Sequence, residues 1–332
     1  MRTIRVAFLG FGTVGRALHA LLERRRDDLA RDLGVECVVT GIASRRLGWR
    51  ADAAGIDGAF PVGVECSDVR AWLAASEAEV VFEAVPLDAE RGQPALDYLR
   101  AVLAHGAHAI SANKGPVVFG YHELTRLAAS RGLEYRFESA VMDGAPVFSL
   151  VRECLPMSGL RAIRGVFTST ATVVLEAIER GGTLADGVAE AQRLGIAEAD
   201  PSYDLDGWDS AVKLCAVANV LLGGELRPTA VARAGIRSLG EDEVLRAASE
   251  GAPYRLVGEL VRGAHGVINA RVAPLQCRLD GPLGIVHGAT LVMHYLAEVF
   301  PGGLTVTSRD PDPVTTAYGM LADLVAVLRS RR

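Results

Sequence analysis

The first 138 residues alternate between short apolar runs and longer segments with helical periodicity. Residues 4–9 form an apolar run typical of a buried parallel strand. A helix is predicted over about 14–33, with leucines at 18, 21, 22 and 29 on one face. Further strands are predicted at 35–43, 80–85, 107–111 and 133–138, and further helices at 69–75, 94–105 and 122–130. This alternation predicts an α/β fold with a doubly wound parallel sheet.

The pattern changes near residue 139. A turn is predicted at 142–146 and a helix at 146–154, followed by strands at 160–168, 257–261, 267–272 and 290–292 and helices at 184–194 and 208–222. An amphipathic helix over 314–328 ends the pattern. We therefore expect a first domain over 1–138, an α+β domain over 139–308, and a C-terminal segment, 309–332, whose helix packs back on the first domain.

A glycine motif lies between the first predicted strand and the first predicted helix. Its residues are Gly10, Phe11, Gly12, Thr13, Val14 and Gly15. A strand, this turn and a helix form the context in which G-x-G-x-x-G binds a dinucleotide, with the pyrophosphate at the helix N-terminus. The sequence thus predicts a Rossmann-type domain, and the alternative is a glycine turn that binds nothing.

The end of the second predicted strand bears on the choice of dinucleotide. An acidic residue there accepts hydrogen bonds from the ribose hydroxyls of NAD, but this chain has Ser44, Arg45 and Arg46. Two guanidinium groups beside a hydroxyl suit a 2′-phosphate. We therefore expect NADP(H) to be preferred over NAD(H). The alternative is that both arginines are solvated loop charges.

Composition narrows the class of protein. The chain has 332 residues and a net charge of −5, and no basic stripe indicates nucleic-acid binding. It has neither an apolar signal segment at its start nor an apolar stretch of membrane-spanning length, so we expect a cytoplasmic protein without membrane contact. The five cysteines are scattered and the seven histidines lack metal-ligand spacing, which disfavours a disulfide framework or a zinc site.

Lysine usage is the unusual feature of the composition. Only Lys114 and Lys213 are lysines among 35 basic residues, so 33 are arginine (35 − 2). Arginine cannot replace lysine where a proton must be given up. Lys114 follows Asn113 at the end of a predicted strand, the edge at which α/β sheets bind ligands. Lys213 follows a segment, 198–209, with five carboxylates in twelve residues.

The acidic segment admits two interpretations. It can bind a substrate ammonium group, or it can be a solvated loop in which Asp209 and Lys213 form an ordinary helical ion pair worth about 0.3–0.5 kcal/mol. Both lysines fall at candidate site positions, which favours the first interpretation.

These motifs together resemble the homoserine dehydrogenase family over nearly the whole chain. The matching residues are Gly10, Gly12 and Gly15, then Asn113 and Lys114, then Glu138, Gly144 and Pro146, and finally Gly195, Glu198, Asp200, Pro201, Asp204, Asp209 and Lys213. The acidic segment is the most specific of these matches.

The resemblance implies NAD(P)-linked interconversion of L-homoserine and L-aspartate 4-semialdehyde, by hydride transfer with lysine acid–base catalysis. It implies that Glu198 and Asp204, with Thr170, bind the amino-acid substrate. Lys114 and Lys213 would flank the reacting hydroxyl, with Asp209 orienting Lys213, and Asn113 would contact the cofactor. The residues alone do not decide which lysine transfers the proton.

The resemblance also implies features outside the reacting centre. A monovalent cation would bind the turn at Glu138, Val141, Asp143 and Ala145, largely through carbonyl groups. We also expect a homodimer formed through the substrate-binding domain. A chain of this length is expected to be a short form without the C-terminal regulatory domain of some relatives.

Three segments depart from the family pattern. Where the family has an N-G-T signature, this chain has Thr168-Ser169-Thr170. Where the family commonly has an aromatic residue, this chain has Ile196. The family's glycine-rich segment is replaced by residues 308–313, which contain no glycine. These departures keep two alternatives open. One is an NADP-dependent reductase of another amino-acid alcohol or semialdehyde. The other is a catalytically silent NADP(H)-binding sensor, against which the two retained lysines argue.

Overall fold

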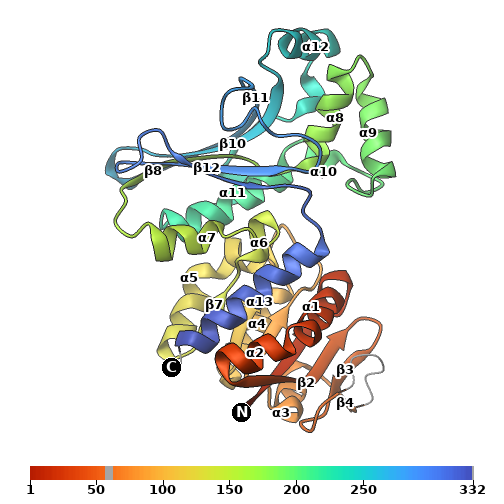
Figure 1. Ribbon diagram of the computed structural model, residues 1–332, viewed down its shortest axis with the longest axis vertical. Coiled ribbons are helices and arrows are strands. Elements are labelled where there is room, and N and C mark those ends of the chain that lie inside the picture. Colours follow the sequence, from red (N-terminus) through yellow and green to blue (C-terminus); the bar gives the residue numbers. More distant parts are fainter. Residues whose placement is uncertain (57–62, 331–332) are drawn as a thin grey trace. The chain divides into compact units, whose positions relative to one another are not determined.

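A computed structural model describes residues 1–56 and 63–330 of the chain. It divides into two compact units, which we call unit 1 (Met1–Gly144 with Asp312–Arg332) and unit 2 (Ala145–Pro311). Most of the helices and several of the strands of each unit are labelled in Figure 1. Among the described residues, none of the helices combines the length and the apolar character needed to cross a bilayer.

Unit 1 contains a seven-stranded sheet within the described residues, in the order β4-β3-β2-β1-β5-β6-β7. The strands are β1 (Arg2–Leu9), β2 (Val35–Ser44), β3 (Gly48–Ala51), β4 (Val64–Cys66), β5 (Val80–Glu83), β6 (His108–Ser111) and β7 (Tyr135–Arg136). The neighbouring pairs β2–β1, β1–β5, β5–β6 and β6–β7 are parallel, which confirms the predicted fold class. Strands β3 and β4 extend the sheet in antiparallel fashion and were not expected.

The helices of unit 1 differ from prediction at two places. They are α1 (Thr13–Arg24), α2 (Arg26–Leu33), α3 (Val69–Ser76), α4 (Ala95–His105), α5 (Lys114–Ser130), α6 (Ser139–Met142) and α13 (Pro313–Ser330). The single helix predicted over 14–33 was wrong, because the chain leaves helical geometry at Arg25. Helix α5 begins eight residues before the predicted position, since Asn113 caps it and Pro116 lies in its first turn, where proline is tolerated.

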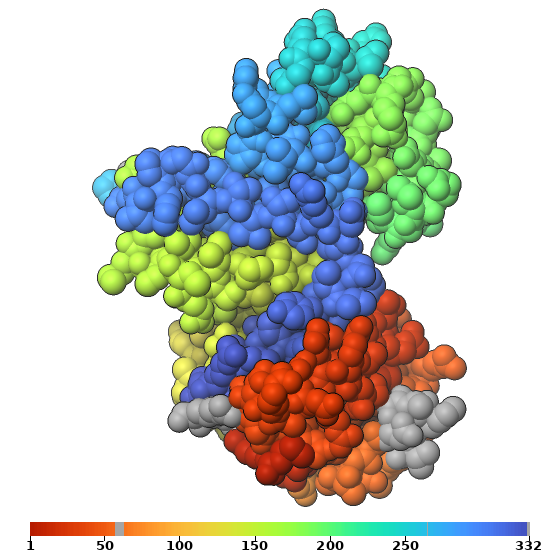
Figure 2. All heavy atoms as spheres, in the orientation of Figure 1, coloured from red at the N-terminus to blue at the C-terminus, as the bar shows by residue number. Residues whose placement is uncertain are grey.

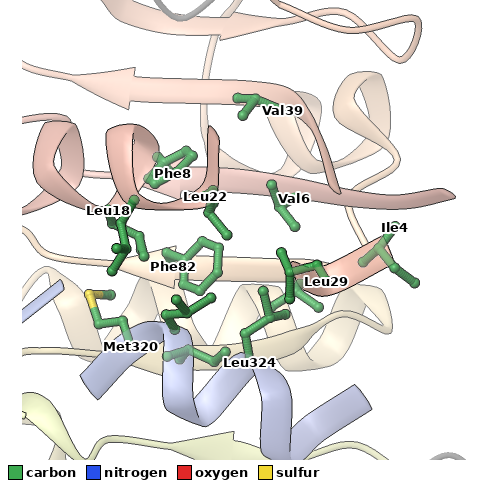
Figure 3. Close-up of a cluster of buried hydrophobic side chains, with 14 of the residues drawn as sticks. Ile4, Val6, Phe8, Leu18, Leu22, Leu29, Val39, Phe82, Met320 and Leu324 are labelled. Atoms are coloured by element: carbon green, nitrogen blue, oxygen red, sulfur yellow. The ribbon is translucent and has the colours of Figure 1, made fainter. Parts of the chain in front are cut away.

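The hydrophobic core of unit 1 contains side chains from both the N-terminal and the C-terminal elements of the chain. Figure 3 shows Phe8 of β1 and Phe82 of β5 packed with Leu18 of α1 and with Met320 and Leu324 of α13. These side chains are at most 1% exposed. Figure 2 shows the blue α13 segment lying against the red α1 segment, and the two helices are in contact. The C-terminal helix is thus part of the hydrophobic core that supports the glycine turn.

Unit 2 contains a six-stranded sheet among the described residues, in the order β13-β12-β8-β10-β11-β9. The strands are β8 (Leu160–Val166), β9 (Ala232–Arg233), β10 (Tyr254–Arg262), β11 (Ile268–Gln276), β12 (Leu291–Ala297) and β13 (Leu304–Ser308). Only the β11–β9 pair is parallel, so the sheet is mixed as predicted.

Helices α8 and α11 pack against β10 and carry the polar residues described below. The α-helices of unit 2 are α7 (Val147–Ser149), α8 (Ser169–Glu179), α9 (Leu184–Arg193), α10 (Ser202–Leu205), α11 (Trp208–Leu221) and α12 (Glu241–Ser249). Single 3₁₀ turns lie at η2 (Pro228–Ala230), η3 (Ile236–Ser238) and η4 (Ala264–Gly266). The helix predicted over 146–154 was only partly right, because α7 passes into a π-helical turn, η1 (Leu150–Cys154).

Candidate active site

The glycines of the turn after β1 have two roles: some allow close packing and one leaves room for a ligand. A Cβ atom at Gly10, where φ is +94°, would lie 2.4 Å from the carbonyl oxygen of Ala84. A Cβ atom at Gly15 would lie 2.5 Å from the carbonyl oxygen of Gly10. At Gly12, by contrast, a Cβ atom would meet no described atom within 4 Å. Gly10 and Gly15 therefore hold the turn against the sheet, and Gly12 leaves open backbone for a ligand.

The N-terminus of α1 has the properties of an anion site. None of the described side chains caps it, and its first turn has no acidic residue. Gly12 and Thr13 are exposed, whereas Phe11 and Val14 are half-buried and pack on the core of unit 1. Unpaired amide groups at a helix N-terminus attract phosphate. These residues fit the pyrophosphate of a dinucleotide.

Ser44, Arg45 and Arg46 lie at the end of β2. The Ser44 hydroxyl accepts a hydrogen bond from the backbone N–H of Leu47 at 3.1 Å, which closes the turn. Arg45 and Arg46 are exposed, and neither forms an ion pair with another described residue. Both guanidinium groups are therefore available to an anionic ligand.

A buried polar cluster that the sequence analysis missed lies at the ends of β5 and β6. Glu83 is fully buried and accepts hydrogen bonds from the Ser111 hydroxyl at 2.5 Å and from the Val85 N–H at 2.8 Å. Asn113 Nδ2 donates to Glu83 at 3.4 Å, and Lys114 follows as the half-buried first residue of α5. Burial raises the pKa of the Glu83 carboxyl to about 7. A glutamate within the apolar run from Val80 to Val85 was the available signal.

Lys213 of α11 is held between two acceptors. Its Nζ atom lies 3.0 Å from Asp209 Oδ2 and donates a hydrogen bond to the Phe167 carbonyl oxygen at 2.7 Å. The side chains of Lys213 and Asp209 are only 14% and 12% exposed. The helical spacing of four residues brings the pair together, and the end of β8 supplies the carbonyl group. This pair is largely removed from water, unlike an ordinary surface ion pair.

Two threonines at the start of α8 complete this cluster. Thr168 donates to Asp209 Oδ2 at 3.3 Å and shares a hydrogen bond with Ser210 at 2.9 Å. Thr170 donates to Asp204 Oδ2 at 2.6 Å. Thr170 was predicted to bind substrate, whereas Thr168 was noted only as part of the segment that departs from the family pattern.

The five carboxylates of the acidic segment differ in their partners and exposure. Asp206 pairs with Arg237, and Asp200 accepts a hydrogen bond from the Ser202 N–H at the start of α10. Glu198 is exposed in the preceding loop, where its backbone carbonyl accepts a hydrogen bond from Gln192. Among the described residues, Asp204 and Asp209 are the carboxylates of this segment that bond to Thr170 and Thr168, and the interpretation of the segment as an ammonium pocket stays a prediction.

The turn predicted to bind a cation contains both buried and strained residues. Glu138 is 3% exposed, and its N–H donates to Asp323 Oδ2 of α13 at 2.8 Å. Val141 is buried within α6, Asp143 has a left-handed φ of 49°, and Ala145 is the half-buried first residue of unit 2. The described residues contain no group of three histidine, cysteine or acidic side chains placed to hold a metal. A monovalent cation bound through carbonyl groups stays a prediction.

Two family models match the chain on either side of the boundary between the units. The NAD-binding domain of homoserine dehydrogenase matches residues 10–138, and the homoserine dehydrogenase model matches residues 146–325. The chain belongs to the homoserine dehydrogenase family. It is an oxidoreductase that acts on a CH–OH group, and the predicted family and enzyme class are confirmed.

Individual homoserine dehydrogenases agree with this assignment. The NAD(+)-dependent homoserine dehydrogenase of Pseudomonas canavaninivorans is 31% identical, with 99% of this chain and 97% of the relative covered. The crystal structure of the enzyme from Thiobacillus denitrificans is 28% identical with a TM-score of 0.87, covering 100% of this chain and 74% of that chain. A hyperthermophilic archaeal homoserine dehydrogenase in complex with NADPH is 25% identical with a TM-score of 0.82, covering 99% and 98%.

Proposed function

We propose that this homoserine dehydrogenase family member interconverts L-homoserine and L-aspartate 4-semialdehyde with a nicotinamide dinucleotide. The observation that carries the proposal is the half-buried Lys213, directed by Asp209 and by the Phe167 carbonyl group. Alcohol oxidation requires an acceptor for the hydroxyl proton as well as for the hydride. A dinucleotide whose pyrophosphate is held at the glycine turn would supply the hydride chemistry through its nicotinamide ring.

Lys213 is the proton-transferring lysine in this proposal. A carboxylate and a carbonyl oxygen around Nζ favour its ammonium form, which is the form needed to protonate an aldehyde oxygen during reduction. The carbonyl carbon then gains the hydride while its oxygen gains the proton, and oxidation returns the proton to Lys213. The proposal also gives Lys114 a catalytic role as a second positive charge that stabilises the substrate oxygen, and it gives Asn113 a role in cofactor binding.

Asp204 and Glu198 bind the substrate ammonium group in this proposal. The support is that the Thr170 hydroxyl donates to Asp204 Oδ2 and so fixes the direction of that carboxylate. Glu198 lies in an exposed loop, from which its carboxylate reaches the substrate through water. The homodimer remains a prediction from family membership, and the cytoplasmic location remains a prediction from the apolar pattern of the sequence.

The first prediction concerns the reaction itself. We expect NADPH oxidation with L-aspartate 4-semialdehyde to exceed that with other amino-acid aldehydes and simple aldehydes, measured by loss of absorbance of the reduced cofactor. Asp204 favours an α-ammonium group, which simple aldehydes lack, and family membership favours L-aspartate 4-semialdehyde among the amino-acid aldehydes. If only a different aldehyde were turned over, that aldehyde, and not L-aspartate 4-semialdehyde, would be the substrate. Tight NADPH binding without any turnover would support a sensor instead.

The second prediction concerns the cofactor. We propose that Arg45 and Arg46 bind a 2′-phosphate, so that NADP(H) is preferred. Replacing both by glutamate should raise KM for NADPH at least about 10-fold, because each charge-assisted hydrogen bond contributes about 1.5–3 kcal/mol. KM for NADH should change much less, and Arg70→Glu, at an exposed position of α3, is the control. Equal increases for both cofactors would contradict the assignment.

Two of the relatives named above differ in their dinucleotide and leave this preference open. The Pseudomonas canavaninivorans relative is named as NAD(+)-dependent, and the archaeal structure contains NADPH. Exposure of Arg45 and Arg46 beside the Ser44 hydroxyl is the feature that favours NADP(H) in this chain.

A further inference from the structure

The buried carboxylate of Glu83 has no part in the proton transfer or substrate binding proposed above. It lies at the last position of β5 with 0% of its surface exposed. Its hydrogen-bond donors are the Ser111 hydroxyl, the Val85 N–H and the Asn113 amide. No cation among the described residues pairs with it. Because burying a carboxylate without a cation is unfavourable, its retention calls for a functional reason.

The hydrogen bonds of Glu83 decide how the Asn113 side chain is oriented. Asn113 Nδ2 donates to Glu83 Oε1 and to the Val85 carbonyl oxygen, at 3.4 and 3.3 Å. Asn113 Oδ1 therefore points the other way, where it accepts a hydrogen bond from the Gly115 N–H at 2.9 Å and caps α5. Ser111, held by Glu83, also accepts a hydrogen bond from the Asn113 N–H at 3.0 Å.

Lys114 lies between the two groups that this network fixes. It is the first residue of α5, with Asn113 before it and Gly115 after it. Both neighbours are tied by hydrogen bonds, one to Ser111 and the other to the Asn113 side chain. The backbone from which the Lys114 side chain extends is thus set by the carboxylate at the end of β5.

We infer that Glu83 is a positioning residue for Lys114, acting through the Asn113 side chain and the first turn of α5. This inference rests on the proposed function, because Lys114 must act on the substrate oxygen for its position to affect turnover. Displacement of the Lys114 ammonium group is expected to lower kcat with little change in substrate affinity, because misplacement by about 1 Å can lower a rate about 100-fold.

The test is a double-mutant cycle between Glu83 and Lys114. Glu83→Leu should lower kcat about 10- to 100-fold and change KM for homoserine less than about 3-fold. In a Lys114→Met background the same substitution should change the residual kcat less than about 3-fold, because its effect passes through the absent ammonium group. A purely structural role would lower kcat by the same factor in both backgrounds, which would overturn the inference.

Glu83→Gln is the conservative control. Its amide oxygen can accept from Val85 and Asn113, while its NH2 group donates to the Ser111 oxygen. Ser111 can then direct its own proton to the Asn113 carbonyl oxygen, which lies 3.4 Å away. We expect Glu83→Gln to keep kcat within about 3-fold of the unmodified enzyme. A loss as large as that of Glu83→Leu would contradict positioning by hydrogen bonds.

Two further outcomes keep the inference separate from the proposed function. If Glu83→Leu fails to fold, Ser111→Ala takes its place in the cycle, because it removes the hydroxyl that links Glu83 to the Asn113 N–H. If Lys114→Met alone leaves kcat unchanged, the proposed role of Lys114 fails, and the inference fails with it. If Lys114→Met lowers kcat and the effects of the two substitutions on kcat are multiplicative, only the inference about Glu83 fails.

Discussion

Replacing Lys213 by arginine is expected to remove almost all turnover while leaving the fold and dinucleotide binding intact. Arginine can keep the ion pair with Asp209 and the hydrogen bond to the Phe167 carbonyl, since both need only a donor. It cannot release a proton under protein conditions. General acid–base catalysis typically contributes about 10²- to 10⁴-fold, so we expect kcat to fall by about 10³-fold.

The measurement is kcat for homoserine oxidation and for semialdehyde reduction, together with thermal unfolding and NADPH binding. Arg278→Lys is the matched control. Arg278 also pairs with a nearby aspartate, Asp280, but its side chain is 78% exposed. It should leave all three quantities unchanged. A Lys213→Arg enzyme with near-normal turnover would rule out proton transfer by this lysine, and Lys114→Arg would then show whether the other lysine serves instead.

The parallel part of unit 1 could be predicted because its signals are local and repeated. Each buried strand is an apolar run, and each helix follows with its own periodicity. Strands β3 and β4 escaped prediction because most of their residues are half-buried or exposed, so they do not form an apolar run. The early start of α5 was missed because Gly115 and Pro116 are typical of a turn. The capping hydrogen bond of Asn113 overrides that preference.

The candidate site shows a similar division. The glycine turn and the Asp209–Lys213 spacing are visible in the sequence because they involve residues close together in the chain. Contacts between distant segments are not visible. Thr168 reaches Asp209 across 41 positions, and Glu83 reaches Ser111 across 28. Equally, sequence cannot tell that Asp206 turns towards Arg237 while Asp204 turns towards Thr170, because both choices depend on how unit 2 folds.

The largest effect on stability is expected in unit 2, where Arg255 of β10 is completely buried. Its guanidinium donates to Glu179 at 2.6 Å, to the Tyr254 carbonyl oxygen at 2.7 Å and to the Val286 carbonyl oxygen at 3.2 Å. Glu179→Leu would leave this charge buried without its counter-ion. We expect the free energy of unfolding to fall by about 3–5 kcal/mol, because breaking one side of a buried ion pair leaves an uncompensated charge.

The adjacent pair Arg180–Glu190 provides the control, since its side chains are 57% and 33% exposed. Glu190→Leu should lower the free energy of unfolding by less than about 1 kcal/mol, as measured by urea unfolding of both variants. Combining Arg255→Met with Glu179→Leu should recover most of the loss, because two apolar side chains replace the pair without leaving a charge behind. If the double variant is no more stable than Glu179→Leu alone, the buried charge is not the cause.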